Sequence, residues 1–216
     1  YEMARPEMES ENGRDVDAVL TTREAARLFR LKNIDLAKLP DEDFDSFMGE
    51  GTGAARIFGT TGGVMEAAIR TVAWKLTGGE MDAIDYEVAR GYRGVKEATL
   101  NINGLEVKVA IVNGIKNAKA VMDDVRAGKS PYHFIEVMAC PGGCLNGGGA
   151  PLLSEPVQVA DRMKKMYDSD ANNKIRRSHE NVQVQKLYEE YLKEPCGHIS
   201  HHLLHTHYVD RSGEVK

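Results

Sequence analysis

Residues 136–151 read EVMACPGGCLNGGGAP, a run that places Cys140 and Cys144 four positions apart among five glycines. The segment that leads into it, Tyr132–Met138, is apolar and rich in β-forming residues, which predicts a short buried strand. Glycine-dense turns leave backbone N–H groups open to whatever the turn encloses. Because soft metals and iron–sulfur clusters prefer thiolate ligands, the two cysteines are candidate cluster ligands.

The spacing alone leaves two interpretations open. Two thiols cannot complete a site of four ligands, so a single C-x3-C pair fits two small buried residues in a turn equally well. Gly142 and Gly143, together with the triple glycine, would also suit a flexible linker. Their place between a predicted strand and Pro151, with cysteines at a fixed spacing, favours a tight loop instead.

The wider pattern resembles a known motif. The residues Glu-x-Met-Ala-Cys-Pro-Gly-Gly-Cys-x-x-Gly-Gly-Gly-x-Pro are similar, almost letter for letter, to the third cluster-binding motif of the [FeFe]-hydrogenases. The resemblance extends across nearly the whole chain. It departs at Ala150, where the family has Gln, so an amide donor and acceptor near the loop is lost.

The resemblance implies a cofactor and a reaction. In the family, a [4Fe–4S] cubane is held by four cysteines, and one thiolate bridges to a diiron unit that carries carbon monoxide, cyanide and an azadithiolate. This H-cluster interconverts dihydrogen with protons and electrons. By resemblance, Cys140 and Cys144 ligate the cubane, and Cys144 also bridges to the diiron unit. Gly142 and Gly143 are implied to line the cofactor, and Met138, a core residue by its pattern alone, is implied to contact the diiron unit.

A second glycine-rich stretch lies far upstream. Residues 49–63 read GEGTGAARIFGTTGG and precede an expected helix over Val64–Leu76, an arrangement that can cradle a phosphate. However, the stretch lacks a Gly-Lys-Ser/Thr ending, and no G-x-G-x-x-G follows a predicted strand. Glycines that let the loop pass close to a bulky group fit better. The resemblance places Phe58 and Gly59 in the pocket of the diiron unit.

Two motifs of the family are absent from these 216 residues. They are Thr-Ser-Cys-Cys-Pro and Met-Pro-Cys-x-x-Lys-x-x-Glu, which carry the other two cubane cysteines. Residues 1–7, YEMARPE, look like the end of the second motif, and Glu2 matches its final, catalytic-site glutamate. We therefore expect a missing N-terminal half or a partner chain to supply those cysteines. We also expect the 216 residues to be inactive by themselves.

Composition excludes several classes of function. With 42% hydrophobic residues and a net charge of −5, the chain is typical of a globular protein with one sizeable domain. No basic stripe indicates nucleic-acid binding, and no run of about 18 apolar residues predicts a membrane span. The three cysteines do not make a disulfide framework, which favours the reducing cytoplasm.

Local patterns predict an α/β fold. Period-two alternation over 98–102 and 105–112, around an Asn-Gly pair, predicts a hairpin with a type I′ turn. An amphipathic helix over 115–127 precedes the strand at 132–138, an order typical of proteins that bind ligands at strand carboxyl ends. The resemblance implies half of an iron-only hydrogenase H-cluster domain, in which helices flank a mixed sheet.

The N-terminal residues carry one strong local signal. Thr21 and Glu24 form a capping-box pattern, which predicts a helix that runs to Leu31. Before it, we expect a surface loop over residues 1–14 and a short strand over Asp15–Leu20.

Composition changes beyond Pro151. We expect residues 1–156 to form the half-domain and residues 157–216 to form a helical tail that wraps over it, with helices over 157–167 and 181–193. The tail resembles the family's C-terminal segment, which is a separate polypeptide in some members.

The tail gathers five histidines and Cys196 within twelve residues. His198, His201, His202 and His205 would suit zinc if one helix carried them. The resemblance instead gives this segment a role in packing and hydrogen bonding, which is the interpretation we favour. Cys196 matches no ligand position and is expected to be a free thiol.

The resemblance also implies partners, namely ferredoxin or NAD(P)-linked subunits that exchange electrons with the cluster. A competing hypothesis is a non-catalytic iron–sulfur protein of the same fold, either a hydrogen sensor or a cluster-assembly scaffold. A third is a metal-free structural fragment. The cysteine motif together with Phe58-Gly59 favours the enzyme, because a scaffold has no need of a diiron cage.

Overall fold

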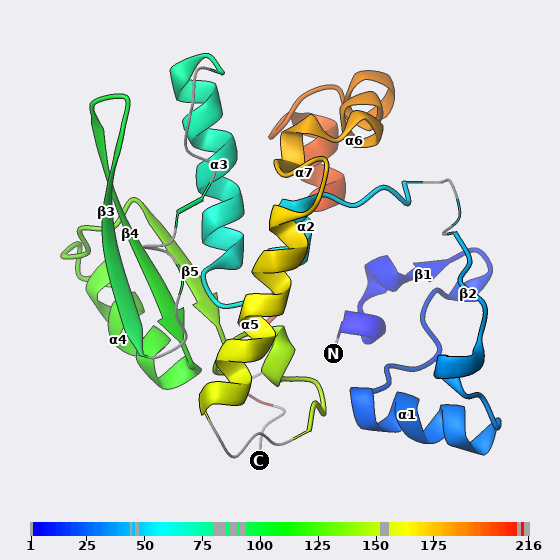
Figure 1. Ribbon diagram of the computed structural model, residues 1–216. Helices are drawn as coiled ribbons and strands as arrows, with labels where there is room; N and C mark the ends of the chain where they lie inside the picture. The colour runs from blue at the N-terminus through cyan, green and yellow to red at the C-terminus, as the bar shows by residue number, and fades with distance from the viewer. Residues whose placement is uncertain are drawn as a thin grey trace.

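The computed structural model describes residues 2–43, 45, 48–79, 85–86, 90, 94–151, 156–210 and 213. Its centre is a mixed sheet with the strand order β3-β4-β5 (Figure 1). The strands are β3 (Val95–Ile102), β4 (Leu105–Asn113) and β5 (Phe134–Met138). Strand β4 pairs antiparallel with β3 and parallel with β5, so the predicted mixed α/β sheet is confirmed.

The turn between β3 and β4 confirms the predicted hairpin. Ile102 pairs with Leu105, which leaves a loop of two residues, and Asn103 and Gly104 have φ values of 51° and 82°. A type I′ turn needs positive φ at both central positions, and Asn followed by Gly tolerates that best.

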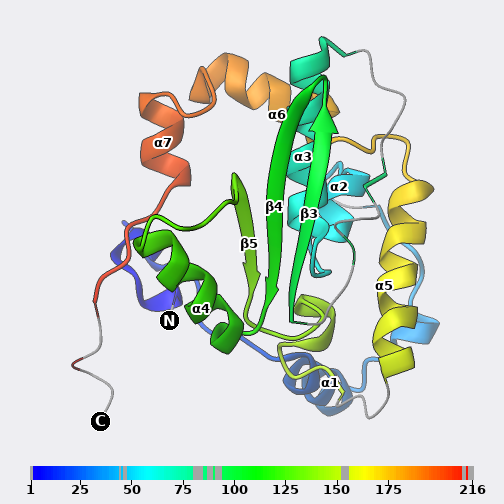
Figure 2. The ribbon, with the colours of Figure 1, turned by 90° about the vertical axis from the view of Figure 1, so that its left-hand side faces the viewer.

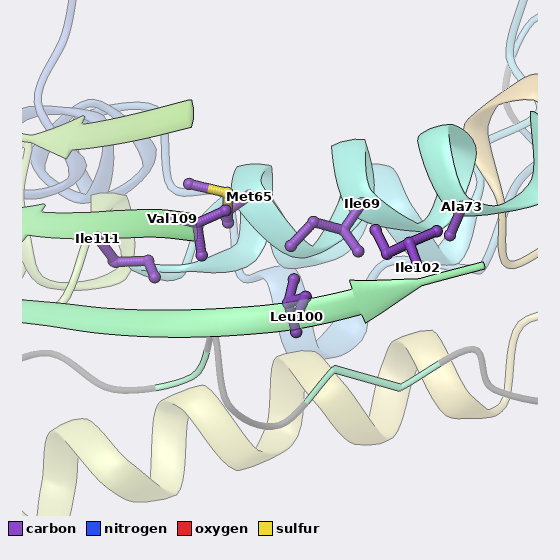
Figure 3. Packing of buried hydrophobic residues seen from close by; sticks show 7 residues of the cluster. All are labelled: Met65, Ile69, Ala73, Leu100, Ile102, Val109 and Ile111. Atoms are coloured by element: carbon purple, nitrogen blue, oxygen red, sulfur yellow. The ribbon is translucent and has the colours of Figure 1, made fainter. Parts of the chain in front are cut away.

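Helices cover both faces of this sheet. Helix α3 (Gly63–Thr77) lies on one face and α4 (Ile115–Arg126) on the other, close to the predicted ranges (Figure 1). Side chains alternate between the faces of a strand. The face of the sheet toward α3 therefore carries a hydrophobic cluster that includes two alternate residues of β4. Figure 3 shows this cluster: Met65, Ile69, Ala73, Leu100, Ile102, Val109 and Ile111. The other alternate residues of β4 face α4: Ala110 and Val112 pack against Ala118 and Val121 of that helix.

Strand β5 corrects one expectation. We expected a buried strand over 132–138, but the strand begins at Phe134, and Phe134 and Val137 are 40% and 43% exposed. The buried residue of β5 is Glu136. Within the described residues, β5 pairs only with β4, so one edge and part of its surface are uncovered.

The N-terminal part departs further from expectation. The predicted loop holds 3-10 turns η1 (Glu2–Ala4) and η2 (Pro6–Met8) and a small hairpin of β1 (Glu9–Ser10) and β2 (Gly13–Arg14). The predicted strand over 15–20 is wrong, because these residues pair with no strand in the described part of the chain. The capping box of α1 (Thr22–Leu31) is confirmed, and 3-10 turn η3 (Leu36–Lys38) follows.

The C-terminal segment is helical, as predicted. Its elements are α5 (Pro156–Ala171), η6 (Ser178–Glu180), α6 (Val182–Leu187), the π-helical turn η7 (Tyr188–Leu192) and α7 (His198–Leu204). Figure 2 shows the segment curving through α6 and α7 back to the N-terminal residues. There the guanidinium of Arg5 lies 5.2 Å from the ring centre of Tyr208. Among the described helices, none is long and apolar enough to cross a membrane.

Candidate metal-cluster site

The cysteine loop begins where β5 ends. The Gly143 N–H donates to the Cys140 carbonyl at 3.0 Å, and 3-10 turn η5 (Cys144–Asn146) follows. Gly142 and Gly143 have φ values of 89° and 92°, a backbone conformation that residues with a Cβ rarely adopt. This tight turn leaves both thiols exposed, so they are accessible to a cluster.

The loop lies against the second glycine-rich stretch. The Leu145 N–H donates to the Gly59 carbonyl at 3.1 Å, and the Thr61 N–H donates to the Gly142 carbonyl at 3.2 Å. A Cβ added at Gly143 would lie 2.7 Å from the Gly59 oxygen, which is closer than real Cβ contacts. The structure therefore brings together two stretches that the sequence separates by about eighty residues.

Two expected pocket residues lie at the start of this second loop. Phe58 follows α2 (Gly53–Ile57) and is 46% exposed. At Gly59, an added Cβ would lie 3.3 Å from the Met166 side chain, so a larger residue would press on α5. Phe58 is thus an exposed aromatic residue on a loop that is hydrogen-bonded to the cysteine loop, and an aromatic ring can shield a cluster from water.

Two further residues that the resemblance assigns to the site are Met138 and Glu2. Met138 is the last residue of β5 and is partly buried, and its carbonyl accepts the Gly114 N–H at 2.7 Å. Glu2 begins η1, but its side chain is outside the described part of the structure.

Glu136 has a role that sequence reasoning missed. Helix α3 begins at the Gly62-Gly63 pair, where no neighbouring side chain caps it. Instead, the Glu136 carboxylate accepts the Gly62 N–H at 2.6 Å and the Met65 N–H at 2.7 Å. Burial raises the pKa of Glu136, although these hydrogen bonds oppose the shift. A carboxylate is stabilised at the positive end of a helix, and the Glu136 carboxylate joins β5 to α3 four residues before Cys140.

Helix α5 forms a wall behind both loops, which the sequence did not reveal. Arg162 donates to the Leu145 carbonyl at 2.9 Å, and the Tyr167 hydroxyl lies 3.4 Å from the Thr60 hydroxyl. A Cβ added at Gly142 would lie 3.0 Å from the Val159 side chain. The signal for this wall was the helical spacing of Val159, Arg162 and Met166, which places them on one face.

A buried ion cluster joins α5 to α3. Arg70 is fully buried, and its guanidinium donates to both oxygens of Asp170 at 2.9 and 2.7 Å and to Glu66 at 2.8 Å. Arg176 adds a further hydrogen bond to Asp170 at 2.7 Å. Burial by itself raises the pKa of Asp170, but the hydrogen bonds from Arg70 and Arg176 outweigh burial, and the net pKa is lowered.

The described part of the chain supplies only part of a metal site. Within it, no group of three or more His, Cys, Asp or Glu side chains is placed to hold a metal ion, and this includes the histidines of α7. Cys196 is exposed and forms no disulfide within the described residues. Two exposed thiolates on one tight loop fit half of a site with four thiolate ligands, such as a [4Fe–4S] cluster.

Two family models match the chain. The model of the iron only hydrogenase large subunit, C-terminal domain, matches residues 1–148, and that of the iron hydrogenase small subunit matches residues 157–211.

Three curated relatives illustrate the range of similar proteins. The chain is 47% identical over 212 residues to the NADP-reducing hydrogenase subunit HndD of Solidesulfovibrio fructosivorans, covering 98% of this chain and 36% of the relative. It is 56% identical over 162 residues to the periplasmic [Fe] hydrogenase large subunit of Nitratidesulfovibrio vulgaris, covering 75% of this chain and 38% of the relative. It is 34% identical over 205 residues to the cytosolic iron-sulfur assembly component 3 of Rattus norvegicus, covering 90% of this chain and 41% of the relative. The chain thus spans less than half the length of each relative.

Solved structures of [FeFe]-hydrogenases also match the chain. A variant of [FeFe]-hydrogenase HydA1 from Chlamydomonas reinhardtii matches with a TM-score of 0.74 and 36% identity over 96% of this chain and 60% of that chain. The structure of HydA(deltaEFG), which concerns stepwise assembly of the H-cluster, matches with a TM-score of 0.73 and the same identity and coverage.

Proposed function

Because the chain belongs to the iron-only hydrogenase family, we propose that it forms part of an [FeFe]-hydrogenase that interconverts dihydrogen with protons and electrons. The cofactors of this family are a [4Fe–4S] cluster and a diiron subcluster. The observation that supports the proposal best is the contact between the two glycine-rich loops. Backbone hydrogen bonds join the loop that carries the two exposed thiols to the loop that begins at the exposed Phe58.

In this proposal, Cys140 and Cys144 would hold a [4Fe–4S] cluster together with two further cysteines, and Cys144 would also hold the diiron unit. The H-cluster, when bound, supplies the chemistry of dihydrogen and a store for electrons. The protein supplies the thiolates at a fixed separation, because Gly142 and Gly143 hold the turn in a conformation that few other residues adopt. Phe58, Gly59 and Met138 exclude water from the diiron unit. Ala150 leaves the loop without the family's amide.

The proposal extends to the parts that this chain does not contain. Glu2 belongs to the site through the second motif, and the remaining cysteines come from an N-terminal half or a partner chain. The 216 residues by themselves are then inactive. Ferredoxin or NAD(P)-linked subunits exchange electrons with the cluster, and the name of HndD supports the NADP-linked case. We place the protein in the cytoplasm, although one relative is named periplasmic.

We also propose the division into a half-domain over 1–156 and a wrapping tail over 157–216. Two separate family models, which match residues 1–148 and 157–211, support a boundary in this region.

A second candidate function is iron–sulfur cluster assembly without hydrogen chemistry. It is favoured by the similarity to cytosolic iron-sulfur assembly component 3. The higher identities to the two hydrogenases, 47% and 56% against 34%, favour the enzyme.

Cysteine variants of the full-length natural protein test the proposal. We expect Cys144→Ser and Cys140→Ser to lower bound iron and to abolish hydrogen evolution, assayed on anaerobically purified protein. Cys196→Ser is the matched control, because Cys196 is also an exposed free thiol, and it should change neither quantity. Iron bound at Cys140 and Cys144 without any hydrogen evolution in the natural protein would favour the assembly function. Full activity in Cys144→Ser would contradict the proposed ligand set.

A further inference from the structure

We propose that Asn113 is a positioning residue that clamps the cysteine loop to the Phe58–Thr61 loop and thereby adjusts the electronic environment of the cluster. Asn113 is the last residue of β4 and is 4% exposed. It lies beside Met138, its register partner in β5, at the carboxyl ends of two parallel strands. This inference rests on the proposed function and assigns a role to a residue outside the cysteine motif.

One side-chain atom of Asn113 contacts both loops. Its Oδ1 accepts the Thr61 hydroxyl at 2.8 Å and the Gly142 N–H at 3.2 Å. The orientation of the amide is determined, because a backbone N–H can only donate and must therefore face the oxygen. A carbonyl oxygen has two lone pairs, so both bonds can form at once.

The backbone of Asn113 is itself fixed. Its N–H donates to the Gly94 carbonyl at 2.9 Å, and its carbonyl accepts the Asn117 side chain at 2.6 Å. The side chain therefore starts from a rigid strand end. Thr61, whose side chain is fully buried, also donates its N–H to the Gly142 carbonyl. Together the three residues form a closed set of hydrogen bonds between the two loops.

This set has consequences for the cluster. Gly142 is two residues from both proposed ligands, so a shift of its backbone changes the separation of the two thiols. Hydrogen bonds and charge near a cluster set its reduction potential. Removing the Oδ1 acceptor should loosen the loop, whereas an aspartate should keep both hydrogen bonds and add a negative charge close to the cluster.

Two variants and a control in the full-length protein test the clamp. In cluster-free protein, Asn113→Ala should speed hydrogen exchange of the Gly142 and Thr61 amides at least tenfold, and Asn113→Asp should restore slow exchange. Asn101→Ala is the control, because the Asn101 side chain accepts the Gly104 N–H at the far hairpin turn, away from both loops. It should leave both amides protected. Unchanged exchange in Asn113→Ala, or an equal increase in Asn101→Ala, would overturn the clamp.

A second readout tests the effect on the cluster. After anaerobic loading, Asn113→Asp should bind as much iron as the natural protein but reduce at a more negative midpoint potential. Asn113→Ala should lose iron faster than Asn101→Ala. An unchanged midpoint potential in Asn113→Asp would refute the electronic part of the proposal. If the natural protein binds no cluster, the proposed function fails, and hydrogen exchange still decides whether Asn113 clamps the loops.

Discussion

Two glycines of the candidate site have no room for a side chain. Gly143 lies against the Gly59 carbonyl, and Gly147 leaves space for Cys140, whose sulfur would be 2.8 Å from an added Cβ. These glycines are needed for two separate reasons, a positive φ at Gly143 and a close approach at both positions. The glycines of this motif therefore serve packing as well as backbone conformation.

Gly143→Ala should destabilise the protein and lower iron retention. The backbone of Gly143 (φ 92°, ψ −166°) is in a region essentially restricted to glycine, which costs a residue with a Cβ about 1–3 kcal/mol, and forcing the new methyl against Gly59 adds about 1–3 kcal/mol. Gly148→Ala is the control for a positive φ without crowding, since Gly148 has a φ of 54° and open space around it, and it should lose only about 1–2 kcal/mol. Urea unfolding and iron analysis measure both effects. Equal losses in the two variants would contradict the packing argument.

Glu136→Ala should weaken the junction of β5 and α3. The variant leaves the buried N–H groups of Gly62 and Met65 without their acceptor, at about 1–3 kcal/mol each. Glu97→Ala, on the exposed surface of β3, should change the free energy of unfolding by less than about 0.5 kcal/mol. A Glu136→Ala protein as stable as Glu97→Ala would show that the carboxylate does not cap α3.

At this scale the sequence indicates candidate ligands but not their supports. Cys140 and Cys144 could be proposed as ligands because they lie within one short motif, and that assignment stays a prediction. Glu136 and Asn113 act on donors 74 and 52 positions away in the chain, and local patterns carry no information on such contacts. Glu136 stood inside the motif, yet only the fold shows which helix it caps.

Among the elements, α5 has the most unexpected place. It belongs to the segment that matches the small-subunit model, yet it touches both loops of the site through Val159, Arg162 and Tyr167. The tail is therefore part of the site's support as well as a covering.

Arg162→Ala should loosen η5. Loss of the hydrogen bond to the Leu145 carbonyl removes about 1.5–3 kcal/mol, the range for bonds to charged groups, and should speed the release of iron. Lys164→Ala is the control on the same helix, because Lys164 forms an exposed ion pair with Asp168. Its effect should be less than about 1 kcal/mol. If both variants released iron at the same rate, α5 would have no specific role at the loop.

The ion cluster between α3 and α5 predicts a pH dependence. Because the folded-state pKa of Asp170 lies below its ordinary value of 3.8, its stabilisation is present above that value and is lost as the pH falls through the folded-state pKa. Asp170→Asn should lower the free energy of unfolding by about 3–5 kcal/mol at pH 7 and weaken its further decrease at acidic pH. Asp168→Asn, which changes an exposed ion pair, should keep the decrease at acidic pH. Unfolding free energies measured from pH 7 to pH 2 compare the three proteins.

Element prediction succeeded where local chemistry is decisive. The Asn-Gly turn and the Thr21–Glu24 capping box depend on neighbouring residues, and both formed as predicted. Residues 15–20 and the exposed face of β5 were predicted wrongly, because a strand and its burial depend on partners elsewhere in the chain.

On the scale of the whole molecule, the two exposed thiols of the cysteine loop are half of the ligand set that we propose, and the chain spans less than half the length of the curated relatives described above. The cysteine loop with its two exposed thiols is hydrogen-bonded to the loop that begins at the exposed Phe58, and helix α5 contacts both loops. The function therefore depends on which cofactor Cys140 and Cys144 hold in the full-length protein.

Infrared absorption of the anaerobically purified full-length protein tests the central claim most directly. A diiron subcluster carries carbon monoxide and cyanide, whose stretching bands lie in a region that is free of protein absorption. We predict these bands in the natural protein and in Cys196→Ser, and their loss in Cys144→Ser. Iron–sulfur absorption without carbon monoxide or cyanide bands in the natural protein would contradict the hydrogenase proposal and favour cluster assembly.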